Sequence, residues 1–209
     1  MSIDVRAAVA AERHDLADIL AALRPEQWDA PTLCDGWRVR EVVAHLTMPF
    51  RYSAPKVLAG LLRAGGNFNK MADRAARRDA ASMSSGGLVA AMANNVNHPW
   101  KPPGGGFEGA LSHDVIHGLD ITVGLGLDRQ VPLDRLRIVL PKDTKAKGVK
   151  YFGVDLTAVE FRADDLDWSL GSGELLQGTG QDLLLALCGR RLPAGRLRGP
   201  ASRRFTAKV

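Results

Sequence analysis

The chain has 209 residues, of which 45% are hydrophobic and 24% are charged, and its formal net charge is +5. This is an ordinary globular composition, and since no run of about 18 apolar residues occurs, no membrane-spanning helix is expected. The N-terminus carries scattered charges and lacks the apolar stretch of a signal peptide. The two cysteines, Cys34 and Cys188, form no CxxC pair, so a reduced, cytoplasmic protein is expected.

The first part of the chain is predicted to be helical. Apolar residues recur at helical spacing over 3–23, and Pro25 follows as a stop signal. A second helix is expected to begin near Trp37, with Asp35 as its N-cap, and to carry His45. Further helices are expected over 56–64, 67–79, 85–97 and 109–124, with a pocket-lining loop at 98–108.

After Asp128 the pattern changes to short segments with strand character, separated by turn residues. An apolar helix over 179–188, ended by Gly189, is expected to follow them, and the basic end could add a last strand. The sequence therefore predicts an α+β chain, with a helical domain over 1–128 and a small α/β domain over 129–209. The expected strands cover 136–140, 151–155, 158–162, 168–170 and 174–177.

The C-terminal end is strongly basic. From Leu183 onward no acidic residue occurs. An anion or nucleic-acid contact is one interpretation, and a solvated basic end that favours solubility is the other. Phe205 is the only aromatic residue in this stretch, so stacking on nucleic-acid bases is not favoured. The basic residues are Arg190, Arg191, Arg196, Arg198, Arg203, Arg204 and Lys208.

The motif that carries most information about function is His113-x3-His117-x2-Asp120. Residues four apart on a helix lie one turn apart on one face, and Asp120 returns to that face. His45, from another helix, could supply a third nitrogen. Three imidazoles leave coordination positions open, which is typical of catalytic rather than structural metal sites.

Each of these residues also has a plainer interpretation. A lone histidine on an apolar helix is more often a hydrogen-bonded core residue than a metal ligand. Asp120 could be a fourth ligand, an acceptor that orients an imidazole N–H, a base, or a solvated salt-bridge partner. No nucleophile elbow, phosphate-binding loop or HExxH motif competes with this candidate site.

Three stretches of the chain resemble one known family. They are 28–46, which reads WDAPTLCDGWRVREVVAHL, the His113–Asp120 motif, and 167–190. Together they are similar to the mycothiol-dependent maleylpyruvate isomerase family, within the DinB-like four-helix-bundle proteins. The resemblance covers nearly the whole chain and implies a DinB-like bundle followed by a C-terminal domain similar to sterol-carrier-type folds.

The resemblance also implies roles for particular residues. His45, His113 and His117 would hold a divalent metal, for which zinc is favoured, while nickel and iron also accept imidazole ligands. Asp120 would be a catalytic or orienting acid, and Arg190 would meet a carboxylate from the C-terminal domain. In the isomerase a glutamate stands where this chain has His113, so the metal site follows from the resemblance but maleylpyruvate as the substrate does not.

The sequence therefore supports two hypotheses. The first is a metal- and mycothiol-dependent enzyme that transfers the thiol to a small electrophilic substrate or isomerises it. The alternative is a metal-binding or sensing module of the DinB-like group without thiol-dependent catalysis. Both predict small-molecule partners, and neither predicts a membrane or nucleic-acid partner.

Overall fold

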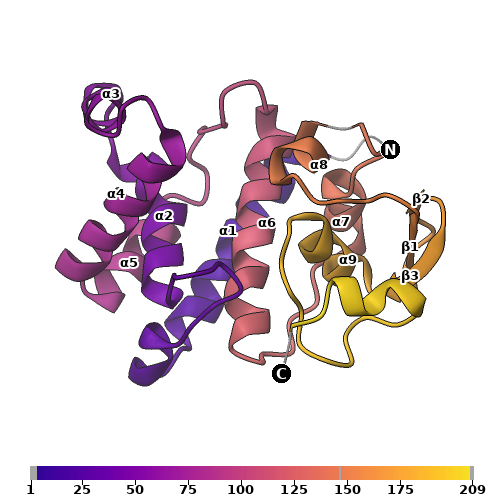
Figure 1. The fold of residues 1–209 in the computed structure, drawn as a ribbon. Helices are drawn as coiled ribbons and strands as arrows, with labels where there is room; N and C mark the ends of the chain where they lie inside the picture. The colour runs from indigo at the N-terminus through magenta and orange to yellow at the C-terminus, as the bar shows by residue number, and fades with distance from the viewer. Residues whose placement is uncertain (1–3, 146, 208–209) are drawn as a thin grey trace. The chain divides into compact units, whose positions relative to one another are not determined.

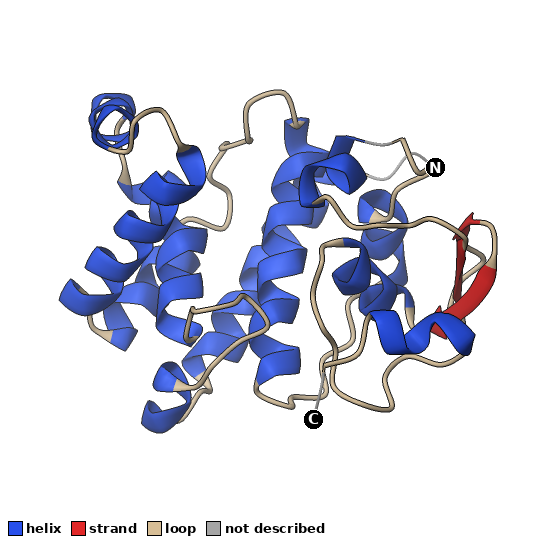
Figure 2. Cartoon of the chain, viewed as in Figure 1, coloured by secondary structure: helices blue, strands red, loops and turns tan. Residues whose placement is uncertain are grey.

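The computed structural model of this chain describes residues 4–145 and 147–207. Contacts within it divide the chain into two compact units, Met1–Leu127 and Asp128–Val209, called unit 1 and unit 2 below. Figure 1 labels the elements along the chain, and Figure 2 shows that the described strands all lie in the C-terminal part. The sequence-based boundary between 128 and 129 falls one residue from this division.

The described part of unit 1 is built on four helices that pack in a ring. α1 contacts α6, α6 contacts α2, α2 contacts α5, and α5 returns to α1. Two further helices lie outside the ring, with α4 packed on α2 and α3 packed on α4. The bounds are α1 Val5–Ala21, α2 Val39–Arg51, α3 Ala54–Arg63, α4 Phe68–Ser82, α5 Ser85–Ala93 and α6 Gly106–Gly124, and a 3-10 helix, η1, covers Pro25–Asp29.

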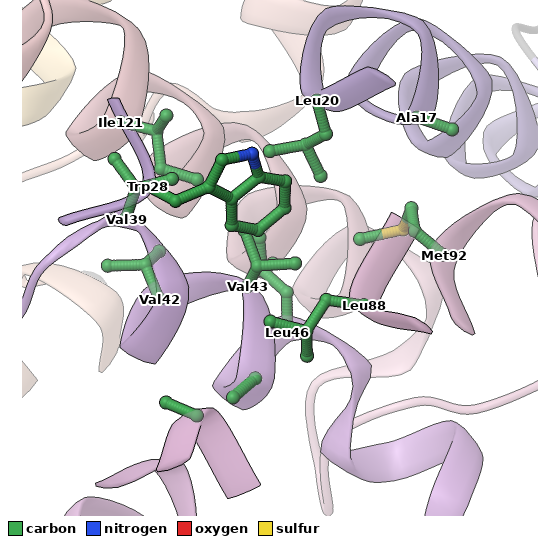
Figure 3. Close-up of a cluster of buried hydrophobic side chains, with 12 residues drawn as sticks. Ala17, Leu20, Trp28, Val39, Val42, Val43, Leu46, Leu88, Met92 and Ile121 are labelled. Atoms are coloured by element: carbon green, nitrogen blue, oxygen red, sulfur yellow. The ribbon is translucent and has the colours of Figure 1, made fainter. Parts of the chain in front are cut away.

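The core of the ring fixes the position of α2. Val39, Val42, Val43 and Leu46 on this helix are each 0% exposed, and Figure 3 shows them gathered with the indole of Trp28. Full burial of one such aliphatic side chain contributes about 1.5–3 kcal/mol, so four of them within about two turns hold the helix firmly. His45 lies within this stretch of α2 and inherits its fixed position.

The helices predicted for unit 1 are present, but the start of α2 differs from the expectation. Asp35 is not its N-cap, and that expectation was wrong. Arg38 occupies the N-cap position, and the Glu41 carboxylate accepts a hydrogen bond from the Arg38 backbone N–H at 2.9 Å. The chain turns tightly between Cys34 and Trp37, where Gly36 adopts a φ of +73°, and this turn delays the helix.

Two prolines of unit 1, Pro49 and Pro55, lie near the ends of helices. Pro49 lies in the last turn of α2, which continues to Arg51. Pro55 lies in the first turn of α3, where a missing backbone N–H costs no helical hydrogen bond. The helix expected over 85–97 ends at Ala93 as α5, and the helix expected from 109 begins three residues earlier, at Gly106.

The described part of unit 2 contains a three-stranded sheet with the order β2-β1-β3. β2 (Ser169–Gly171) is antiparallel to β1 (Val159–Ala163), and β3 (Glu174–Gly178) is parallel to it. Helix α9 (Gly180–Leu187) packs on β1 and β3. The remaining elements are α7 (Leu133–Val139), α8 (Lys147–Phe152) and a 3-10 helix, η2 (Pro200–Arg204).

The last three expected strands correspond to β1, β2 and β3, whereas the first two expectations were wrong. Residues 136–140 belong mostly to helix α7, because Leu136 and Leu140, four apart, are both buried and Asp134 lies in the first turn. Residues 151–155 complete helix α8 and then turn at Gly153, whose φ is +62°. Short apolar runs give no reliable distinction between helix and strand.

The basic end forms no further named strand within the described residues up to 207. It makes isolated bridges, Leu192 with Thr206 and Gln177 with Arg198, and the 3-10 helix η2 lies between them. Pro193, Gly195 and Pro200 interrupt any longer ladder.

The α+β class predicted from the sequence is confirmed by this arrangement of a helical bundle and a small mixed sheet. Among the described residues, no helix is both long and apolar enough to cross a bilayer. The cytoplasmic location stays a prediction.

The close approach of Gly171, at the end of β2, to the backbone of β1 yields a stability prediction. A methyl group on Gly171 would lie 2.4 Å from the Val159 carbonyl oxygen, and Gly171 has a φ of +81°. Gly195 has a similar φ of +87° but has nothing within 4 Å. We expect Gly171→Ala to lose about 1–3 kcal/mol more stability than Gly195→Ala, because backbone overlap adds to the shared left-handed strain.

Urea denaturation of the two variants and the parent chain measures this difference. An equal loss in both variants would show that the conformation alone, and not the close approach to β1, sets the requirement for glycine.

Candidate metal centre

Helix α6 carries two of the candidate ligands on one face. His113 and His117 lie one turn apart, and their side chains are 17% and 15% exposed. Their rings have centroids 5.0 Å apart and meet nearly edge to face, at 82°. The helix is long enough, at 19 residues, to place both histidines in its middle, where the backbone is fully hydrogen-bonded.

Helix α2 brings His45 to the same place. Its ring centroid lies 5.1 Å from that of His113 and 4.9 Å from that of His117. The Nε2 atoms of His45 and His113 are 3.2 Å apart. One ligand atom from each of the three imidazoles lies within 4.8 Å of the other two, so residues 68 and 72 positions apart in sequence converge because α2 packs on α6.

Each histidine on α6 has a carboxylate on its Nδ1 atom. Asp114 Oδ1 lies 3.0 Å from Nδ1 of His113, and Asp120 Oδ2 lies 3.0 Å from Nδ1 of His117. Because a carboxylate only accepts hydrogen bonds, these contacts favour the tautomer with the proton on Nδ1. In this tautomer the Nε2 atom carries the lone pair that can bind a cation, and a carboxylate behind a metal-binding histidine usually has this effect.

His45 lacks such a partner. It is 9% exposed, and its Nδ1 atom is buried without a hydrogen-bond partner. Burial, and then the nearby His117 and His113, hold the pKa of His45 well below its ordinary value. The imidazole is therefore neutral at physiological pH, the state in which it can donate a lone pair to a metal.

Two tryptophans border the cluster. The Trp37 ring lies 5.1 Å from His45, and the Trp100 ring lies 5.1 Å from His113, centroid to centroid. Trp37 is fixed by a 2.8 Å hydrogen bond from its indole Nε1 to Asp73 on α4. Trp100 comes from the Pro- and Gly-rich loop at 98–108 and brings this loop against His113. That the loop lines a pocket stays a prediction.

A second group of potential ligands overlaps the first. Cys34 Sγ, one nitrogen of His117 and one oxygen of Asp120 lie within 4.8 Å of one another. Cys34 comes from the turn before α2, and the backbone N–H of the next-door Leu33 donates to the Asp120 carbonyl oxygen at 3.1 Å. This contact brings the Cys34 turn against α6.

The ion pair between Arg13 and Asp114 was not foreseen from the sequence. Arg13, on α1, is 0% exposed, and its Nε donates to Asp114 Oδ2 at 2.7 Å. Asp114 directly follows His113, so its position beside a candidate ligand could be noticed in the sequence. Arg13 offered no such signal, because its neighbours His14 and Asp15 are typical of a polar surface. His14 is indeed on the surface, paired with Asp18 at 3.2 Å.

The remaining predicted site residue, Arg190, lies in unit 2. Its Nη1 donates to the Cys188 carbonyl oxygen at 3.2 Å. It lines a pocket of about 380 Å³ with Arg191 and Arg204, close to α9 and η2. Its expected contact with a substrate carboxylate stays a prediction, as do the ligand roles of the three histidines and the role of Asp120.

Comparison with known proteins finds a family model that matches part of unit 1. Residues 9–98 match the family model described as the mycothiol maleylpyruvate isomerase N-terminal domain. The match lies within unit 1. The match includes His45 and ends before α6, so the convergence of His113 and His117 with His45 rests on the structure alone.

Two solved structures share the fold of the whole chain. One is a mycothiol-dependent maleylpyruvate isomerase variant, with a TM-score of 0.60 and 10% identity, and the other is the mycothiol-dependent maleylpyruvate isomerase itself, with a TM-score of 0.54 and 11% identity. Each alignment covers 95% of this chain and 92% of the other. The resemblance identified from the sequence is confirmed at the level of the fold, and the family model supports it over residues 9–98. No curated protein sequence matches the chain.

The lowered pKa of His45 predicts a pH dependence of stability in the metal-free protein. In the unfolded chain the imidazole gains a proton below its ordinary pKa of about 6.5, whereas in the folded protein it stays neutral to lower pH. Stability is therefore fully present above pH 6.5 and falls as the pH drops below it. We expect the free energy of unfolding of His45→Gln to fall less steeply than that of the parent chain as the pH drops below 6.5, by up to about 1.4 kcal/mol per pH unit.

Urea denaturation of chelator-treated protein between pH 7.5 and 5 measures both slopes. Parallel slopes for the parent chain and His45→Gln would contradict a neutral, buried His45.

Proposed function

We propose that this protein is a metal-dependent enzyme that uses a low-molecular-weight thiol, mycothiol by family resemblance, on a small electrophilic substrate. The reaction would be transfer of the thiol or isomerisation through its addition and elimination. The observation that carries the proposal is the convergence of three imidazoles, one ligand atom from each lying within 4.8 Å of the others.

The chemistry of the donor set fits a divalent metal. With Nδ1 of His113 and of His117 facing carboxylates, their Nε2 atoms present lone pairs. The 3.2 Å separation between the Nε2 atoms of His45 and His113 places two such donors side by side, an arrangement that a shared cation stabilises. Three imidazoles suit zinc, which is favoured here, and they also suit nickel or iron.

When bound, the metal would supply Lewis acidity that holds a thiol as its thiolate near neutral pH. An imidazole ligand brings no negative charge, so three of them would leave the charge of the cation uncompensated and favour an anionic further ligand. With the glutamate expected from the family resemblance, one negative charge would already be present. His113 therefore supports thiol chemistry in general and does not support maleylpyruvate as the substrate.

The residues around the histidines have distinct proposed roles. Asp114 and Asp120 orient the imidazoles through their Nδ1 atoms, and Asp120 could also move a proton during the reaction. The rings of Trp37 and Trp100 keep bulk water from two sides of the histidine cluster. Arg190, with Arg191 beside it in a basic pocket of unit 2, is proposed to meet a substrate carboxylate.

One prediction of the proposed function concerns metal content. The parent chain is expected to bind one divalent metal ion, and the His113→Ala/His117→Ala double variant is expected to bind almost none, because two of three ligands are lost. Elemental analysis of both proteins after metal loading and desalting measures this. His14→Ala is the matched control, since His14 is exposed and pairs with Asp18, which is not part of the histidine cluster.

Equal metal content in the parent chain and the double variant would refute the site. Loss of metal in His14→Ala as well would indicate binding to surface histidines.

Another prediction of the proposed function concerns binding of the thiol to the metal. In cobalt-loaded protein, added mycothiol is expected to produce a thiolate-to-cobalt charge-transfer absorption, because the sulfur binds the metal directly. Mycothiol methylated on sulfur is the control and should produce none. If mycothiol gives no such absorption and supports no turnover of any electrophile, the metal-binding or sensing alternative is favoured instead.

A further inference from the structure

One fully buried cation lies behind the histidine cluster. Arg13 on α1 is 0% exposed, and Asp114 on α6 is 1% exposed. The Nε of Arg13 donates to one oxygen of Asp114 at 2.7 Å, and the other oxygen of Asp114 lies 3.0 Å from Nδ1 of His113. A continuous path of charge-assisted contacts therefore runs from α1 through Asp114 to His113.

The same guanidinium reaches a second segment near the cluster. Its Nη1 donates to the His98 carbonyl oxygen at 2.7 Å, and its carbon lies 4.7 Å from the centre of the Phe50 ring. His98 in turn accepts a hydrogen bond on Nδ1 from the Trp100 backbone N–H at 3.2 Å. Arg13 thus anchors both a carboxylate behind His113 and the segment that carries Trp100 against His113.

Stability alone is a poor reason for this pair. Removing two charges from water costs several kcal/mol, and apolar replacements of buried ion pairs are often neutral or stabilising. The planar fork of the guanidinium donates in fixed directions to two different acceptors at 2.7 Å, whereas the ammonium group of a lysine has no such fixed fork. The geometry instead serves orientation, because the second oxygen of Asp114 is directed to an imidazole nitrogen.

We propose that Arg13 is a positioning residue for the metal centre. By fixing the Asp114 carboxylate, Arg13 holds the proton of His113 on Nδ1 and keeps Nε2 directed toward His45 and His117. This inference rests on the proposed metal site and adds a residue from a third helix to it. Arg13 touches neither metal nor substrate and acts through Asp114 and the His98 carbonyl.

The deciding variant removes both charges at once. Arg13→Met alone would leave Asp114 buried without its partner, which costs about 3–5 kcal/mol and endangers folding. Arg13→Met/Asp114→Asn removes both members of the ion pair, so neither is left without its partner, and keeps the side-chain volumes similar. We expect this double variant to fold and to bind zinc about 10–100-fold more weakly than the parent chain, the usual effect of losing a group that orients a ligand.

Asp79→Asn is the matched control. Asp79 is a buried carboxylate in another arginine pair, with Arg51 at 2.6 Å, and it also accepts from Tyr52. It lies on α4, which is not one of the helices that carry the histidines. We expect Asp79→Asn to lose stability but to keep the zinc affinity of the parent chain, so a general effect of buried ion pairs is separated from positioning.

Two further readouts test action through Asp114. The visible spectrum of the cobalt-loaded double variant is expected to differ from that of the parent chain, because the His113 ligand is no longer held in one orientation. Zinc affinities of Arg13→Met, Asp114→Asn and the double variant form a cycle. The two single effects are expected to sum to more than the effect of the double variant.

The outcomes separate this inference from the proposed function. If the parent chain binds no zinc, the proposed function fails and this inference fails with it. If the parent chain binds zinc and a folded double variant has the same affinity and the same cobalt spectrum, only the role of Arg13 is overturned. Weaker binding in the double variant with unchanged binding in Asp79→Asn supports it.

Discussion

The packing of α2 on α6 is the constraint on which the candidate centre depends. It brings the Nε2 atoms of His45 and His113 to 3.2 Å from each other. The contact is possible because α2 buries Val39, Val42, Val43 and Leu46 completely, so the helix cannot slide or rotate without exposing them. An apolar core thus determines where three polar nitrogens meet.

Burial of these imidazoles creates an electrostatic problem that the surrounding groups solve in part. Burial and the two neighbouring histidines lower the pKa of His45, since a charged ring there would be poorly solvated and repelled. The carboxylates of Asp114 and Asp120 compensate the Nδ1 protons of the α6 histidines, while Nδ1 of His45 has no partner. His45 is therefore held by packing, and the α6 histidines are held by hydrogen bonds.

The sequence was informative about this centre wherever a short helical spacing was enough. The spacing of His113, His117 and Asp120 predicts a shared face on one helix, and the structure places them on α6. The pairing of that face with His45 needed the tertiary contact between helices, which came from a family resemblance and not from periodicity. Arg13 could not be found in this way, because its partner Asp114 lies 101 residues away and its immediate neighbours are polar. In unit 2 the residues 136–140 show the same limit, since their apolar run suits a strand and a buried helix equally well.

The chain differs from the family resemblance at one of the proposed ligand positions, and the groups around His113 are compatible with that change. A glutamate in place of His113 would bring its own negative charge to the metal. His113 brings none, but Asp114 stands directly behind its ring and Arg13 stands behind Asp114. The negative charge therefore lies on Asp114, one imidazole ring farther from the proposed metal position, and the Arg13 guanidinium largely balances it. A cation bound by the three histidines would therefore keep a higher net charge toward its open positions than the glutamate-containing site. That difference should alter which anionic ligand the centre prefers, while the frame of α1, α2 and α6 that holds the ligands is unchanged.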